Sequence, residues 1–189
     1  MRFSTLFLAG LGAISASALP TTDTCSGSNP NKYFGLIAIH SGSAVHNAAL
    51  SASLSSIFAN LPNQNAQCNR PNERFATFYI KDGALFLYTP ESAEKQQMFV
   101  DRSGMGMGKI GYITGNSGHP RYAELTGWSI NSENHLQFAG NDLVACPNSI
   151  QNSWSIWAAG FQNPGHNQNC IGIAARVEYS TDPNACVYS

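Results

Sequence analysis

The sequence predicts an all-β fold, a single compact antiparallel domain of repeated hairpins that is either β-trefoil-like or a β-sandwich. The strongest sign is a pair of strand-forming runs, Phe75–Ile80 and Ala84–Tyr88, on either side of the dipeptide Asp82-Gly83. Both residues of this dipeptide tolerate the positive φ that tight hairpin turns require. The two-residue period of a strand places Leu85 and Leu87 on one face and Phe86 and Tyr88 on the other, so we expect this hairpin to pack on both sides or to lie against a loop.

The same outline occurs three times along the chain. Ile39, Ile80 and Ile130 each precede a tight turn and an apolar return strand, at intervals near those of a compact β repeat. This spacing suggests pseudo-threefold architecture, although a sandwich explains the strands almost as well. A chain of 189 residues without a long linker forms one domain.

The N-terminal segment 1–18 matches a secretory signal peptide. Arg2 precedes an apolar run, and small residues occupy 16–18, where signal peptidase cleaves. The run is shorter than the roughly 20 residues of a membrane-spanning helix. It also lacks the polar face of an amphipathic helix. We expect cleavage after Ala18, an irregular Pro-, Thr-, Ser- and Asn-rich arm over 19–32, and a single β domain over 33–189.

The first part of the β domain predicts short strands separated by polar loops. A strand is expected from Tyr33 through Ile39, followed by a turn at 40–43 and a return strand through Val45. Alternation within Ala48–Leu61 favours one further strand over a helix. The segment 62–73 carries two prolines and is expected to be a loop.

The glycine-rich loop Asp101–Gly108 follows a predicted strand at Gln97–Val100. Its glycine spacing fits neither the phosphate-binding loop of nucleotide hydrolases nor the dinucleotide-binding motif. We therefore interpret it as a tight corner with Met105 and Met107 turned inward. A strand is expected next at Lys109–Thr114, and an exposed loop at 115–125.

The C-terminal part predicts a second clear hairpin and three further strands. In Trp154–Ala159 we expect both indoles on one face of the strand, and the last strand is expected to close the sheet. The predicted strands are Trp128–Ile130, His135–Phe138, Asp142–Cys146, Trp154–Ala159 and Ile171–Tyr179.

The chain has five cysteines, and the signal peptide implies an oxidising compartment, so we expect two disulfides and one remaining thiol. Four cysteines allow three pairings. We favour Cys146 with Cys170, because the segment between them can fold back as a hairpin, and Cys68 with Cys186. Cys25 then stays free or pairs between molecules. No CxxC or HxxxH spacing supports a zinc site instead.

Charge patterning argues against nucleic acid as a partner. Charged residues make up 11% of the chain, against about 25% in ordinary soluble proteins. The basic residues are scattered singly, whereas binding to phosphates requires clusters. A neutral surface rich in hydroxyl and amide groups suits an extracellular matrix.

No catalytic, cofactor-binding or metal-binding residue is predicted. His40 and His46 flank a turn without a neighbouring carboxylate or cysteine, so we interpret them as polar hairpin edges. No nucleophile-elbow motif occurs. Two carboxylates placed across a cleft would suggest a glycosidase, but we expect the candidates to be turn and strand-end residues. These candidates are Asp101, Glu124, Glu133 and Asp142.

Aromatic residues suggest one binding hypothesis. Trp128, Trp154 and Trp157, with Tyr112 and Tyr122, would form a platform on which sugar rings stack, if their rings face solvent. The alternative is that these tryptophans belong to the core.

Five ordered stretches show that the chain resembles the fungal cell wall protein phiA family, whose members are small secreted proteins of filamentous fungi. They cover most of the chain after the signal peptide. The stretches are FGLIAIHSGSAVH at 34–46, ATFYIKDGALFLY at 76–88, VDRSGMGMGKIGY at 100–112, GWSINSENHLQF at 127–138 and ACPNSIQNSWSIW at 145–157.

The resemblance implies a secreted, non-enzymatic cell wall protein that supports phialide and conidium formation and stress tolerance. It also implies wall polysaccharide or other wall proteins as partners, and some relatives are IgE-binding allergens. The alternative is a secreted carbohydrate-binding or host-interacting protein. The chain contains no N-glycosylation acceptor, and its last residues lack the hydrophobic tail of a GPI signal, so we expect no membrane anchor in the secreted form.

Overall fold

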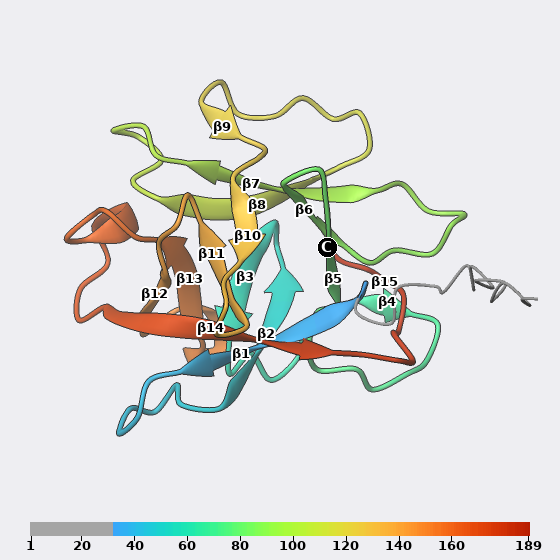
Figure 1. The fold of residues 1–189 in the computed structure, drawn as a ribbon, viewed down its shortest axis with the longest axis horizontal. Helices are drawn as coiled ribbons and strands as arrows, with labels where there is room; N and C mark the ends of the chain where they lie inside the picture. The colour runs from blue at the N-terminus through green and yellow to red at the C-terminus, as the bar shows by residue number, and fades with distance from the viewer. Residues whose placement is uncertain (1–31) are drawn as a thin grey trace, which may run out of the picture.

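A computed structural model describes residues 32–189 (Figure 1). The predicted signal peptide at 1–18, residues 19–31 of the predicted arm, and Cys25 lie outside the described residues. The described chain is a single all-β antiparallel domain. Apart from two short 3₁₀ turns, Ile150–Asn152 and Pro164–His166, residues 32–189 contain no helix. None of these turns is long and apolar enough to cross a membrane.

Most strands follow the predicted runs, with two exceptions described below and short additions in two loops. The loops at 62–73 and 115–125 were predicted without strands, and each contributes one strand of two residues. The strands are β1 (Phe34–Ile39), β2 (Ala48–Ser53), β3 (Ser56–Ala59), β4 (Gln67–Cys68), β5 (Phe78–Lys81), β6 (Ala84–Leu87), β7 (Gln96–Asp101), β8 (Lys109–Thr114), β9 (Ala123–Glu124), β10 (Trp128–Ile130), β11 (His135–Phe138), β12 (Leu143–Cys146), β13 (Trp154–Ala158), β14 (Ile171–Tyr179) and β15 (Cys186–Val187).

Eight strands form a closed barrel. Hydrogen bonding runs from β1 through β5, β6, β7 and β8 to β13, and returns through β3 and β2 to β1. Strand β14 pairs with every residue of β1 and also with β11 and β12 (Figure 1). Closure satisfies backbone groups that an open sheet would leave at its edges.

Neither a β-trefoil nor a β-sandwich describes this connectivity. A sandwich keeps two sheets face to face, whereas here one path of hydrogen bonds runs around the barrel. The hairpins predicted after Ile80 and Ile130 exist, whereas the return strand after Ile39 begins only at Ala48, and the three units are not equivalent. Strand β1 pairs with β14, β2 and β5, while β10 pairs with β11 alone among the described strands.

The hairpin centred on Asp82-Gly83 is confirmed. Asp82 and Gly83 have φ values of 52° and 75°, and β5 pairs with β6 in register around them. Leu85 and Leu87 are buried in the core, as their alternation predicted. The turn residues and the alternation of apolar side chains both favour a hairpin here, so this hairpin could be predicted from the sequence.

The single strand predicted at Ala48–Leu61 is wrong, because the segment forms the β2–β3 hairpin. Its turn residues, Leu54 and Ser55, have φ values of 48° and 52°. Such values are rare for residues with a side chain, so no local signal marks the turn. The return strand predicted through Val45 is also wrong. Val45 is buried within the turn at 40–47, and β2 begins at Ala48.

Met105 and Met107 do not turn inward as predicted. Met105 is 92% exposed, and Met107 is half-buried. The glycines of this loop are required because neighbouring atoms lie too close for a side chain. A Cβ on Gly106 would lie 2.2 Å from Asp101 Cγ, and Gly108 has a φ of 88° with Ala158 O within 2.8 Å of its Cβ position. The loop therefore needs glycine for close backbone approach, not to bury methionine.

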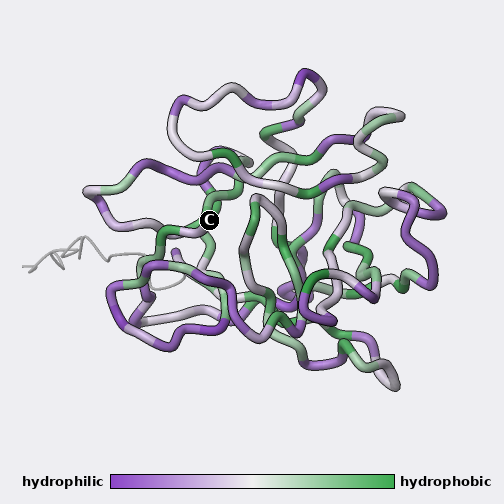
Figure 2. Tube along the Cα trace, turned by 180° about the vertical axis from the view of Figure 1, so that it is seen from behind, coloured by the Kyte–Doolittle hydropathy of each residue, from purple (hydrophilic) through white to green (hydrophobic). Residues whose placement is uncertain are grey.

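The core fills the barrel with side chains from alternating strand positions. Phe34, Leu36 and Ala38 of β1 are buried, as are Ile173 and Ala175 of β14. Hydrophobic colour follows the central strands in Figure 2, and hydrophilic colour concentrates in the outer loops. Burial of these inward faces is the main contribution to stability.

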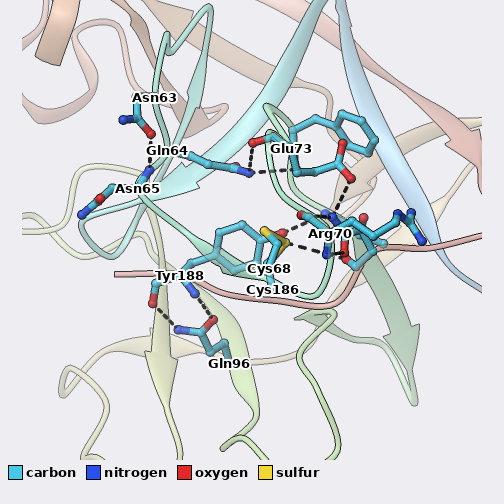
Figure 3. Close-up of a disulfide and its surroundings, with 12 residues drawn as sticks. Asn63, Gln64, Asn65, Cys68, Arg70, Glu73, Gln96, Cys186 and Tyr188 are labelled. Carbon is cyan, nitrogen blue, oxygen red and sulfur yellow. Dashed lines mark hydrogen bonds between the residues drawn. A yellow bond between two sulfur atoms is a disulfide. The ribbon is translucent and has the colours of Figure 1, made fainter.

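Two disulfides join the cysteine pairs favoured from the sequence. Cys68 bonds to Cys186, which ties β4 to β15, and Cys146 bonds to Cys170. Next to the first disulfide, Gln96 holds the backbone of Tyr188 with hydrogen bonds in both directions (Figure 3). The C-terminal segment is thereby fixed to the barrel.

Candidate functional site

The predicted tryptophan platform is not assembled. Trp128 is only 3% exposed and packs edge-on against Phe138 in the core, with ring centroids 5.0 Å apart. Tyr112 is buried as well, and only Tyr122 of the predicted set is well exposed. The alternative interpretation, a core residue, is the correct one for Trp128.

Trp154 and Trp157 do not share a face of β13, which corrects a second expectation. Trp154 packs against the core cluster that contains Ile156 and Ala158. Residues three apart in a strand point to opposite faces, so Trp157 lies on the outer face with Ser155. Trp157 Nε1 donates a hydrogen bond to Ser155 Oγ at 2.8 Å.

A cluster of tyrosines lines a cleft on the outer face of the barrel. The Tyr33 ring lies 4.2 Å from that of Tyr88 and 5.8 Å from that of Tyr79, measured between centroids. Tyr79 stacks on Phe86 at 5.1 Å with an interplanar angle of 13°. All four rings are half-buried. We call the hollow beside Tyr33, Tyr79 and Tyr88 the tyrosine cleft.

The barrel positions these rings through strand alternation. Tyr79 and Phe86 are cross-strand partners on the outer face of the β5–β6 hairpin, opposite the face that buries Leu85 and Leu87. The Phe34–Phe78 pairing between β1 and β5 then brings Tyr33 beside this face. Strand alternation predicts Phe86 and Tyr88 on the second face of the hairpin, whereas no local pattern predicts that Tyr33 joins them.

The tyrosine cleft has a volume of about 370 Å³ and mixes aromatic and charged groups. Lys32, Lys81 and Lys95 line it together with one carboxylate, Glu91. Lys32 Nζ lies 4.9 Å from the centre of the Tyr33 ring. A hydrogen bond to Tyr33 raises the pKa of Lys32, so this ammonium stays charged at neutral pH.

The Tyr79 phenol of this cleft is a neutral hydrogen-bond donor. Burial raises the pKa of Tyr79, and the neighbouring Tyr33 raises it further, so the Tyr79 hydroxyl keeps its proton at neutral pH. Flat rings with polar tips suit a ligand that has an apolar face and hydroxyl groups. Sugar rings have both features, and the surrounding lysines add hydrogen-bond donors.

The four candidate carboxylates have structural partners. Glu124 accepts hydrogen bonds from Arg102 Nε at 2.7 Å and Nη2 at 2.6 Å, and this bond to Arg102 lowers the Glu124 pKa. Asp101 Oδ1 accepts the backbone N–H of Ser103. The other two lie at turns and contact nearby side chains. Asp142 accepts from Gln137 Nε2 at 2.9 Å, and Glu133 lies 3.7 Å from His135 Nδ1.

The histidines of the first turn also have local contacts. His40 Nδ1 lies 2.6 Å from the carbonyl oxygen of Gly172, and His46 Nδ1 accepts the backbone N–H of His40. Across residues 32–189, no three His, Cys, Asp or Glu side chains are grouped so that they could hold a metal ion. The tyrosine cleft is therefore the candidate site that we consider further.

Comparisons with known proteins point to one family. A family model described as "PhiA-like secreted protein" matches residues 34–189. The chain is 60% identical over 178 residues to "Cell wall protein phiA" of Aspergillus fumigatus, covering 94% of this chain and 95% of that protein. Identity to the protein of the same name from Aspergillus niger is 56% over 178 residues, covering 94% of each chain. For Arthroderma benhamiae it is 41% over 152 residues, covering 77% of this chain and 81% of that one. No solved structure matches.

Proposed function

This chain belongs to the family of PhiA-like secreted proteins, and from that premise we propose that it is a secreted, non-enzymatic component of the fungal cell wall. The names of its relatives support the wall location. Two disulfides suit a protein that works outside the cell. We also propose that Leu19 is the first residue of the secreted form, because the signal-peptide pattern ends at Ala18.

The tyrosine cleft suggests how the protein is retained in the cell wall. We propose that it binds wall polysaccharide, with sugar rings stacked on Tyr79 and its neighbours, and that this binding retains the protein in the wall. The lysines around the cleft donate hydrogen bonds to sugar hydroxyls or to acidic groups of the glycan. The tyrosine cleft thus takes the place of the predicted tryptophan platform.

Replacing Tyr79 by alanine is expected to weaken binding to isolated wall polysaccharide about fivefold, since one aromatic contact contributes about 1 kcal/mol. Tyr79→Phe keeps the ring and is expected to retain most of the affinity. Co-sedimentation of the purified variants with insoluble glucan and chitin measures both effects. Thermal melting of each variant checks that the loss does not reflect unfolding.

Tyr122→Ala is the matched control, because Tyr122 is 54% exposed and does not line the tyrosine cleft. Its binding should equal that of the unchanged protein. Equal losses for Tyr79→Ala and Tyr122→Ala would mean that the tyrosine cleft has no special role. The proposal then fails at the level of the site, while wall location would still rest on family membership.

We further propose that the protein supports phialide and conidium formation and tolerance of stress, which rests on the resemblance to the phiA family. Deletion of the gene should reduce conidium number, and the tagged protein should partition into the wall fraction with Leu19 at its N-terminus. Normal sporulation, with all of the protein in the medium, would favour the alternative function, a secreted carbohydrate-binding or host-interacting protein.

A further inference from the structure

Lys109 is held in an unusual setting on the barrel wall. It begins β8 and pairs with Trp157 of β13. Its Nζ donates a hydrogen bond to Ser56 Oγ and lies 5.6 Å from the centre of the Trp157 ring. Among the described residues it forms no ion pair. The partners of the Lys109 amine are therefore the Ser56 hydroxyl and the Trp157 ring, and not a carboxylate.

Burial makes the Lys109 ammonium easier to deprotonate than that of an ordinary lysine. Burial lowers the pKa of Lys109, because desolvation disfavours the charged ammonium. Asp101 is its cross-strand partner in the β7–β8 register, but Asp101 Oδ1 accepts the Ser103 N–H. The pocket beside Lys109 is lined by no other ionisable side chain among the described residues.

That pocket has a volume of about 260 Å³ and provides polar groups next to the amine. Ser149, Ser155 and Asn167 line it. Ser155 Oγ already accepts the Trp157 Nε1 proton, and among residues 32–189 its own hydroxyl proton has no acceptor. Ser155 can therefore donate to an oxygen that enters the pocket.

Trp157 is fixed in place as one wall of this pocket. A Cβ on Gly165 would lie 2.2 Å from Trp157 Cη2, so the loop that contains the second 3₁₀ turn packs closely against the indole. The same indole faces Lys109. The amine is thus held between fixed groups and does not extend into solvent like an ordinary surface lysine.

We propose that Lys109 is a nucleophilic amine that condenses with small aldehydes entering this pocket to form an imine. The Nζ lone pair attacks the carbonyl carbon, and the first Nζ proton passes to the carbonyl oxygen to give a carbinolamine. Loss of that oxygen as water, with the second Nζ proton, forms the C=N bond. The step needs no oxidant or reductant, and Ser155 stabilises the carbinolamine oxygen by donating its hydroxyl proton.

The test is site-resolved labelling of the full secreted chain with glyceraldehyde and cyanoborohydride, which reduces the imine to a stable amine. Peptide mass mapping then compares Lys109 with Lys81 and Lys95, which are exposed. At pH 7, Lys109 should react faster, by about tenfold for each unit by which burial lowers its pKa from the ordinary lysine value. This advantage should shrink as the pH approaches 10, because an ordinary lysine amine is then also partly neutral.

Two variants test the roles of Ser155 and Lys109 in this labelling. Ser155→Ala should slow labelling at Lys109 and leave Lys81 and Lys95 unchanged, whereas Lys109→Arg should abolish only the adduct at that position. Trace acetylation with acetic anhydride across the same pH range reports the protonation of each lysine independently of aldehyde entry. If Lys109 reacts more slowly than Lys81 at pH 7, or titrates together with it, the proposal is wrong.

Discussion

Replacing both Cys68 and Cys186 by alanine is expected to lower the free energy of unfolding by about 5 kcal/mol, against about 3.5 kcal/mol for the same change at Cys146 and Cys170. The difference follows from the loops that the disulfides close. The first pair is separated by 118 residues in sequence and the second by 24. A longer closed loop removes more conformational entropy from the unfolded chain.

The structure gives a second reason why the first disulfide matters more. Cys68 and Cys186 are partners in the two-stranded β4–β15 sheet, and a sheet of this size is not stable by itself. Without the covalent bond, the C-terminal segment is held by noncovalent contacts alone, among them the hydrogen bonds of Gln96 and Tyr188 (Figure 3). Loss of this disulfide should therefore also increase amide exchange in β15.

Urea unfolding, extrapolated to water, measures the free energy of unfolding of each double variant. The Cys146–Cys170 variant is the matched control, because it removes the same chemistry from a shorter loop. Equal losses would show that loop entropy does not set the stability of this protein. A larger loss for Cys146–Cys170 would mean that local packing at that bond outweighs loop length.

Gln96→Leu is expected to lower the free energy of unfolding by about 4 kcal/mol, because it leaves buried backbone groups without partners. Gln96 is fully buried. Its Nε2 donates to Tyr188 O at 2.8 Å and to Thr114 Oγ1 at 3.0 Å, and its Oε1 accepts the Tyr188 N–H at 2.9 Å. Leucine fills a similar volume but restores none of these bonds.

Gln97→Leu is the control for this prediction. Gln97 is the next residue of β7, so its side chain points to the other face of the strand, where it is half-buried. We expect a change of at most about 0.5 kcal/mol, as for ordinary surface substitutions. Chemical denaturation of both variants checks the difference. Gln96→Leu as stable as Gln97→Leu would mean that water or a shift of the C-terminal segment replaces the lost bonds.

Local chemistry explains what could be predicted from the sequence. The β5–β6 and β10–β11 hairpins have apolar strands in alternation around turns whose residues adopt positive φ, Asp82, Gly83 and Asn134 among them. The pairing of Cys146 with Cys170 could be predicted because the short segment between them can fold back as a hairpin. For the two hairpins the information lies within a few residues, where propensity and pattern act together.

Other predictions failed where a distant contact decides the local conformation. The turn at Leu54 and Ser55 adopts left-handed backbone without glycine, and the N–H of Ser55 donates to Ser189 O at 3.1 Å from the far end of the chain. Met105 was placed inward because methionine is apolar, yet its loop is shaped by the approach of Gly106 to Asp101. Propensity is too weak to reveal either arrangement.

The sequence alone determined the all-β class, the main hairpins and the family, because strand alternation, turn residues and the five stretches that resemble the family are local properties of the chain. Only the tertiary structure decided that the barrel closes, that Trp128 is buried, and that Tyr33 meets Tyr79 and Tyr88. It also placed Lys109 beside Ser56, 53 residues away in sequence. These contacts join distant segments, and their positions depend on how the whole barrel packs its core.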